Sequence, residues 1–91
     1  MPTFVIERNV PGASELTAEQ LREIATTSND VVDGLGVEYT WHHSYVAGDK
    51  IYCVHETDDA DTVREHAERG GFPANLVVKV AAVIGPETAT Q

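Results

Sequence analysis

The chain has 91 residues, which is the size of a single domain. Its 15 acidic and 6 basic residues give a net charge of −9, which argues against a surface that binds nucleic acid or anionic lipid. The longest apolar stretch, 77–85, contains Lys79 and is far shorter than the ~20 residues that span a bilayer. We recognise no signal peptide, and the single Cys53 cannot form an intrachain disulfide. These features predict a small, acidic, cytoplasmic domain without nucleic-acid or membrane partners.

The first third of the chain predicts a strand followed by a helix. Residues 3–8 are rich in β-forming side chains and precede a Pro-Gly pair, which is typical of a strand and its end. Thr17 and Gln20 have the spacing of a capping box, which starts a helix. Gly34 and Gly36 supply the stop signal. The apolar residues on one face of this helix are Leu21, Ile24, Ala25, Val31, Val32 and Leu35.

The remaining two thirds predict a hairpin, a second helix and a last strand. Two segments dense in β-branched and aromatic residues, 37–46 and 51–55, flank the tight turn 47–50. Asp58 or Asp59 caps a helix that presents Ala60, Val63 and Ala67 inward and ends at Gly70-Gly71. The last strand is predicted over 76–84, and residues 1–86 then form one domain followed by a flexible tail, 87–91.

The element order is β-α-β-β-α-β, which predicts an α+β fold of the ferredoxin-like type. In this arrangement a four-stranded antiparallel sheet carries both helices on one face. The other face has no cover from the chain itself.

A hairpin centred on Gly48-Asp49 predicts which side chains share a face. Tyr45 would lie opposite Tyr52, and His42 would lie opposite His55. An aromatic face left without helices would indicate an interface, so we expect a homodimer. The face predicted to be free of helices holds Tyr39, Trp41, His43, Tyr45, Tyr52 and Val54. The face predicted to pack under the helices holds Thr40, His42, Ser44, Val46, Ile51, Cys53 and His55.

Metal-ligating side chains are concentrated in this hairpin. Three of the four histidines and the only cysteine lie between His42 and His55, and imidazole and thiolate are ligands for zinc, nickel and copper. No C-x-x-C or H-E-x-x-H motif is present, so spacing alone leaves the alternative that these histidines are solvated or structural and that Cys53 is a small buried side chain. His66, at the edge of the apolar face of the second helix, is open to the same two interpretations.

Several motifs distributed over nearly the whole chain resemble a small family found mainly in actinobacteria, formerly labelled a domain of unknown function. They are Phe4-Val5-Ile6-Glu7-Arg8 with Pro11-Gly12, Leu16-Thr17, Ser28-Asn29, Trp41, His43-Ser44-Tyr45-Val46, Asp49-Lys50, Tyr52-Cys53-Val54, Arg64-Glu65-His66-Ala67, Gly71-Phe72-Pro73-Ala74 and Val83-Ile84-Gly85-Pro86.

The resemblance implies a nickel-binding protein that has a ferredoxin-like fold and forms a tight dimer. It implies His43 and His66 as metal-site residues, with Tyr45, Cys53 and Glu65 as weaker candidates. His42 and His55 stand at positions that the family motif does not specify, and they remain candidates on their chemistry alone.

Three functions remain open at this point. The first is a metal-binding protein that acts as a nickel buffer or as an accessory to a sensor. The second is a small dimeric enzyme that uses His43 as acid or base in a pocket on the sheet. The third is an interaction module whose aromatic residues serve only dimerisation. No catalytic residue is assigned.

Overall fold

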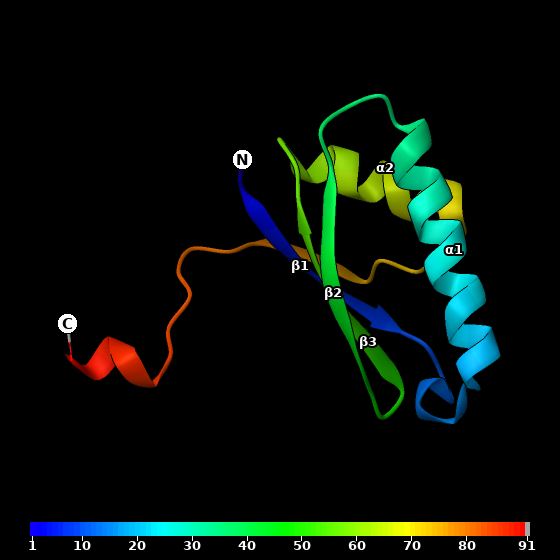
Figure 1. Cartoon of the computed structure of the whole chain (residues 1–91), viewed down its shortest axis with the longest axis horizontal. Coiled ribbons are helices and arrows are strands. Elements are labelled where there is room, and N and C mark those ends of the chain that lie inside the picture. Colours follow the sequence, from blue (N-terminus) through cyan, green and yellow to red (C-terminus); the bar gives the residue numbers. More distant parts are fainter. Residues whose placement is uncertain (91) are drawn as a thin grey trace.

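The computed structural model describes residues 1–90 and shows the predicted order of elements. Four antiparallel strands form one sheet in the order β2-β3-β1-β4, and both helices lie on the same side of it (Figure 1). This is the predicted ferredoxin-like α+β fold.

The strands are β1 (Thr3–Asn9), β2 (Thr40–Ala47), β3 (Lys50–Glu56) and β4 (Leu76–Lys79). The helices are α1 (Ala18–Gly34) and α2 (Ala60–Gly70), with short 3-10 helices at Ala13–Glu15 and Pro86–Thr90. Among residues 1–90, no helix has the length and apolar character needed to cross a membrane.

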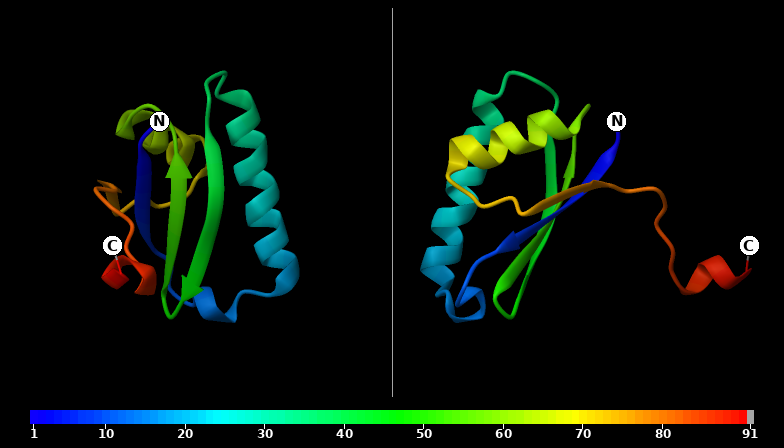
Figure 2. Two further views of the ribbon diagram at one scale, coloured as in Figure 1. Left: turned by 60° about the vertical axis from the view of Figure 1, so that its left-hand side comes forward. Right: turned by 180° about the vertical axis from the view of Figure 1, so that it is seen from behind.

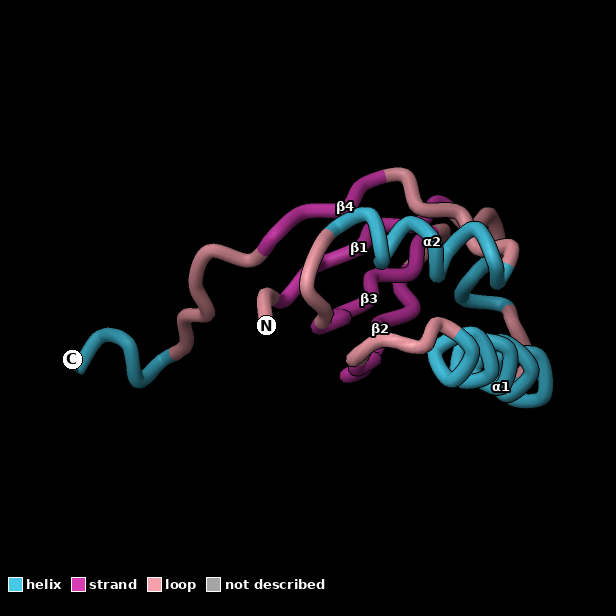
Figure 3. Tube along the Cα trace, turned by 90° about the horizontal axis from the view of Figure 1, so that it is seen from above, coloured by secondary structure: helices cyan, strands magenta, loops and turns pink. Residues whose placement is uncertain are grey.

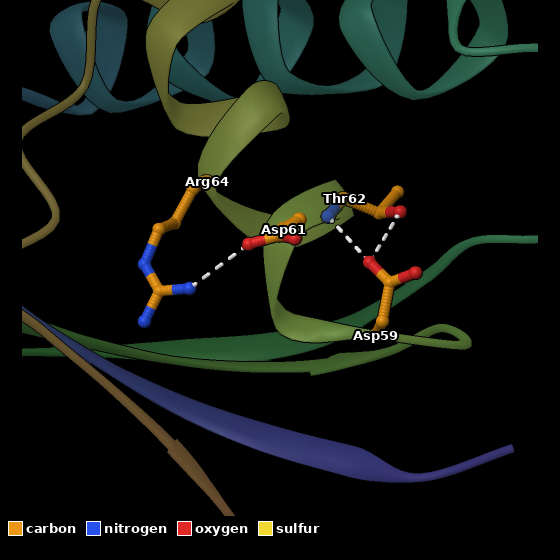
Figure 4. A network of polar contacts seen from close by, with 4 residues as sticks. All are labelled: Asp59, Asp61, Thr62 and Arg64. Carbon is orange, nitrogen blue, oxygen red and sulfur yellow. Dashed lines mark hydrogen bonds and ion pairs between the residues drawn. The ribbon is translucent and has the colours of Figure 1, made fainter.

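Both helices begin at side-chain caps. At the start of α1, the Gln20 amide donates to Thr17 Oγ1 at 3.1 Å, and the Thr17 amide donates to Gln20 Oε1 at 2.9 Å. At the start of α2, Asp59 Oδ1 accepts from the amide of Thr62 at 2.8 Å and from its hydroxyl at 2.9 Å (Figure 4). These bonds satisfy amides that have no partner inside the helix, so both starts could be predicted from local sequence.

The hydrophobic core lies between the sheet and the helices. Strand alternation sends Phe4 and Ile6 of β1 and Ile51 of β3 to this side, and all three are buried. Val63 of α2 meets them and is fully buried. This layer therefore supplies the main apolar burial of the domain.

A β-bulge in β2 changes the predicted register of the hairpin. The pairs near the turn are as predicted, but the register shifts between Trp41 and His43, so that Trp41 lies opposite His55. The predicted pairing of His42 with His55 is therefore wrong. The extra residue also reverses the alternation before it, and it places Tyr39 and Trp41 on the helix-covered side rather than on the helix-free side.

Two strand boundaries also differ from the prediction. β2 begins at Thr40 rather than at residue 37, and β4 ends at Lys79 rather than at residue 84. The Val80 amide donates to the carbonyl of Thr3 at 2.8 Å, and because β1 begins at Thr3, later residues have no strand to pair with.

The C-terminal segment leaves the sheet on the side opposite the helices (Figures 2 and 3). Val83 and Ile84 in this segment are 89% and 79% exposed. The predicted tail is helical over Pro86–Thr90, and Gln91 lies outside the described residues. The segment therefore presents apolar side chains beside the helix-free face.

Candidate functional site

The candidate site residues are divided between the two faces of the sheet. His55 and Cys53 of β3 and His66 of α2 lie on the helix-covered side, where all three are buried. His43 lies opposite Val54 and shares the helix-free side with it, because directly paired residues point to the same face. The structure therefore does not bring His43 and His66 together within one chain.

The buried histidines form a compact cluster with Tyr39. The rings of His55 and His66 are 5.0 Å apart between centroids, and the Tyr39 ring is 5.2 Å from His55 and 5.3 Å from His66. The Tyr39 hydroxyl shares a hydrogen bond with His55 Nδ1. A second hydrogen bond, 3.0 Å long, joins Ser28 Oγ of α1 to His66 Nε2 of α2 and so connects the two helices. The cluster therefore links the sheet to both helices.

Burial keeps the histidines of this cluster neutral. Burial, with a second contribution from the neighbouring His66, lowers the pKa of His55 to about 3. It also lowers the pKa of His66 to about 4, with a second contribution from the positive charge of Arg8. Burial raises the pKa of the Tyr39 hydroxyl well above its ordinary value, so Tyr39 is neutral as well.

On the helix-free side, an exposed histidine pairs with a carboxylate. His42 Nε2 lies 2.9 Å from Glu56 Oε1, and both side chains are about one-third exposed, at 39% and 32%. His43, the next residue in the bulge, packs against Tyr45 with ring centroids 5.1 Å apart. The bulge thus places His42 beside Glu56, a residue that sequence reasoning did not select.

Glu65 stands apart from both groups. It is exposed on α2 and forms an ion pair of 2.5 Å with Arg69, one helical turn away. Its carboxylate therefore has a partner already.

Within residues 1–90, no three His, Cys, Asp or Glu side chains converge on a point where they could hold a metal ion. His42 and Glu56 are in direct contact, and imidazole and carboxylate are both ligands that Ni²⁺ accepts.

A cavity of about 330 Å³ lies between α1 and the sheet. Its wall includes Trp41, Cys53, His55 and His66, and it does not include His43. A pocket of the kind required by the enzyme hypothesis is thus present, but the histidine proposed as its acid or base is outside it.

Sequence reasoning missed Arg8, which also lines this cavity and is only 4% exposed. The signal was present in β1, where Phe4, Ile6 and Arg8 alternate on one face. A charged residue in register with two core residues indicates a buried charge.

Comparisons with known proteins agree with this fold. The sequence matches the family model described as "Nickel responsive protein SCO4226-like" over residues 4–80. The crystal structure of SCO4226 from Streptomyces coelicolor A3(2) superposes with a TM-score of 0.73 at 22% identity, covering 90% of this chain and 99% of that chain. The comparison with curated proteins gives no match.

Proposed function

The chain belongs to the SCO4226-like family of nickel responsive proteins, and on this premise we propose that it binds Ni²⁺ or a similar divalent transition metal as a metal buffer or sensor accessory. The observation that carries the proposal is the exposed His42–Glu56 pair, with Nε2 and Oε1 2.9 Å apart. His43 is the third ligand candidate, because it is the neighbouring residue of the same bulge.

The chemistry of this pair suits a borderline divalent ion. Ni²⁺ accepts imidazole, carboxylate and water in octahedral geometry, so a site with few protein ligands can be completed by solvent. The exposure of both side chains lets the ion keep part of its hydration shell. The net charge of −9 also favours the approach of a cation.

The buried cluster suits a cation less well. His55 and His66 are neutral and could ligate, but the positive charge of Arg8 acts on both of them. No carboxylate within residues 1–90 forms an ion pair with Arg8. A metal ion entering this side would meet uncompensated positive charge, which is why we place the metal on the helix-free face.

We further propose that the helix-free face is the interface of a homodimer. Four apolar side chains on this face are between 38% and 60% exposed, and the projecting C-terminal segment adds Val83 and Ile84. A two-fold related copy would cover this surface and would bring a second set of the same ligands to it. The four side chains are Val5, Tyr45, Leu76 and Val78.

Calorimetric titration of untagged protein with NiCl₂ tests the metal site. We expect Ni²⁺ to bind, to raise the melting temperature, and to lose affinity in acid, because protons compete with the metal for imidazole. His42→Gln and Glu56→Gln should each weaken binding by about tenfold or more, because each removes a ligand. His43→Ala should remove most of the thermal gain.

The matched control is Glu65→Gln, which neutralises an exposed carboxylate on α2 and should leave the affinity unchanged. If the parent protein does not bind Ni²⁺, or if His66→Gln weakens binding while His42→Gln and Glu56→Gln do not, the helix-free metal site is wrong.

Light scattering at micromolar concentration tests the dimer. We expect about twice the mass of the 9.9 kDa chain, and we expect Tyr45→Glu to shift the protein toward monomer by placing charge on the covered face. A parent protein that is monodisperse at the mass of one chain would refute the interface.

A further inference from the structure

Within residues 1–90, Arg8 is a buried cation that forms no ion pair with an acidic side chain. Its side chain is 4% exposed on the helix-covered side of β1. Nε donates to Cys53 Sγ at 3.3 Å, Nη1 donates to the carbonyl of Pro73 at 2.6 Å, and the guanidinium carbon lies 5.6 Å from the centre of the Phe72 ring. Among residues 1–90, no Asp or Glu forms an ion pair with it, although Lys50 and two exposed arginines each have such a partner.

These neutral contacts hold the guanidinium in place and leave its charge uncompensated. A guanidinium has five N–H donors, and the described contacts occupy two of them. Burying a charge without a counter-charge is costly, so proteins usually pair buried arginines with carboxylates or with anionic ligands. The histidines nearby are neutral and supply no negative charge.

The wall that contains Arg8 belongs to the cavity between α1 and the sheet. Its volume of about 330 Å³ lies in the range of small-molecule sites. The rest of the wall is mostly apolar: Leu21, Ile24 and Ala25 come from α1, and Trp41, Val46 and Ile51 come from the sheet. The cavity thus combines one fixed positive charge with an apolar chamber.

We propose that this cavity binds a small organic monocarboxylate, with its carboxylate on Arg8 and its apolar body against α1 and Trp41. A guanidinium presents parallel N–H groups that match a carboxylate. One cation balances one negative charge, and no lysine or second arginine among residues 1–90 lines the cavity, so a monoanion fits better than a phosphate dianion. The site is separate from the proposed metal site on the other face of the sheet.

Fluorescence of Trp41, the only tryptophan in the chain, provides a direct readout because its ring lines the cavity. The probes are phenylacetate, octanoate and the neutral phenylacetamide, titrated into the full chain without added metal. We expect at least one carboxylate to bind and phenylacetamide to bind about tenfold or more weakly, because only the carboxylate makes charge-assisted hydrogen bonds. Tighter binding of phenylacetate would indicate that the cavity prefers an aromatic ligand, and tighter binding of octanoate would indicate that it prefers an aliphatic one.

Three variants locate the site. Arg8→Gln should reduce the preference for carboxylate over amide to near unity, whereas Arg22→Gln, which removes an exposed arginine on α1, should leave it unchanged. Ala25→Phe should abolish binding of both carboxylates by filling the cavity, and it decides the matter if Arg8→Gln does not fold.

The proposal is overturned if neither carboxylate binds at millimolar concentration, if acid and amide bind alike, or if Ala25→Phe binds as the parent does. Ni²⁺ affinity should be unchanged in Ala25→Phe, so the two proposals fail independently.

Discussion

The two faces of the sheet use histidine in opposite ways. On the helix-covered face, His55 and His66 are each 1% exposed, share hydrogen bonds with Tyr39 and Ser28, and are neutral because of burial. On the helix-free face, His42 is exposed and pairs with a carboxylate. The residue type is the same, so the environment alone decides whether the side chain is a structural element or an available ligand.

The two faces of the sheet also differ in the charges that they carry. The helix-covered face contains a buried cation, Arg8, whereas the helix-free face carries Glu56 and a second carboxylate, Glu7, paired with Lys50 at 2.6 Å. A cation is therefore better accommodated on one face and an anion on the other.

The largest expected effect contrasts adjacent residues of β1 that point to opposite faces. Ile6 is fully buried and Val5 is 38% exposed. Ile6→Ala should lower the free energy of unfolding by about 2–5 kcal/mol, because it leaves a cavity in the core. Val5→Ala should cost less than about 1 kcal/mol in a dilute sample. Urea denaturation at two protein concentrations measures both, and a cost for Val5→Ala that grows with concentration would indicate that the dimer covers this face.

The next effect is a loss of stability in acid, which His55 and His66 on the helix-covered face should cause. Their pKa values of about 3 and about 4 lie below the ordinary value of 6.5, so the unfolded chain takes up protons first. Their contribution to stability is fully present above pH 6.5 and is lost as the pH falls toward the folded-state values. We expect a loss of roughly 1.4 kcal/mol for each histidine between about pH 7.5 and pH 5.5.

Urea denaturation across this pH range measures the acid effect, and His66→Gln should reduce its slope by about half. Val5→Ala is the control from the other face, because it changes no titratable group and should leave the slope nearly unchanged. A parent protein whose stability is flat between these pH values would contradict the neutral, buried state of the cluster.

A third effect concerns access to thiols on the two faces. Cys53 is 6% exposed and is buried as predicted, so we expect a thiol reagent to modify the native protein at least about a hundredfold more slowly than the unfolded protein. Cys53→Ala combined with Tyr45→Cys moves the thiol to a position whose native side chain is 60% exposed. This variant should react quickly in dilute solution. Equal modification rates for Cys53 in the parent protein and for the cysteine in the Tyr45→Cys variant would contradict the difference in exposure between the two faces.

The smallest expected effect concerns α1, the helix that covers the cavity. Thr17→Ala removes the hydroxyl that accepts from the Gln20 amide, and it should lower stability by about 1 kcal/mol. Because α1 covers only one face, phenylacetate binding should weaken more than Ni²⁺ binding. Thr17→Ser, which keeps the hydroxyl, is the matched control, and a loss equal to that of Thr17→Ala would contradict the capping role.

Local sequence determined most of the architecture. The capping box at Thr17, the Asp59 cap, and the alternation of Phe4 and Ile6 all depend on residues within a few positions of one another. Such short-range signals act before the chain is folded, so the order of elements and the ferredoxin-like fold could be read from the sequence. The buried arginine at Arg8 was predictable by the same alternation and was overlooked.

Tertiary structure decided how the histidines are distributed. The bulge between Trp41 and His43 inserts one residue into β2, and a shift of one residue reverses the face of every earlier side chain in the strand. It moves Tyr39 and Trp41 under the helices and places His42 beside Glu56. His66 becomes fully buried because α2 packs onto the sheet beside Tyr39 and Phe72. These outcomes depend on contacts between elements far apart in the sequence, which periodicity and spacing within one segment do not contain.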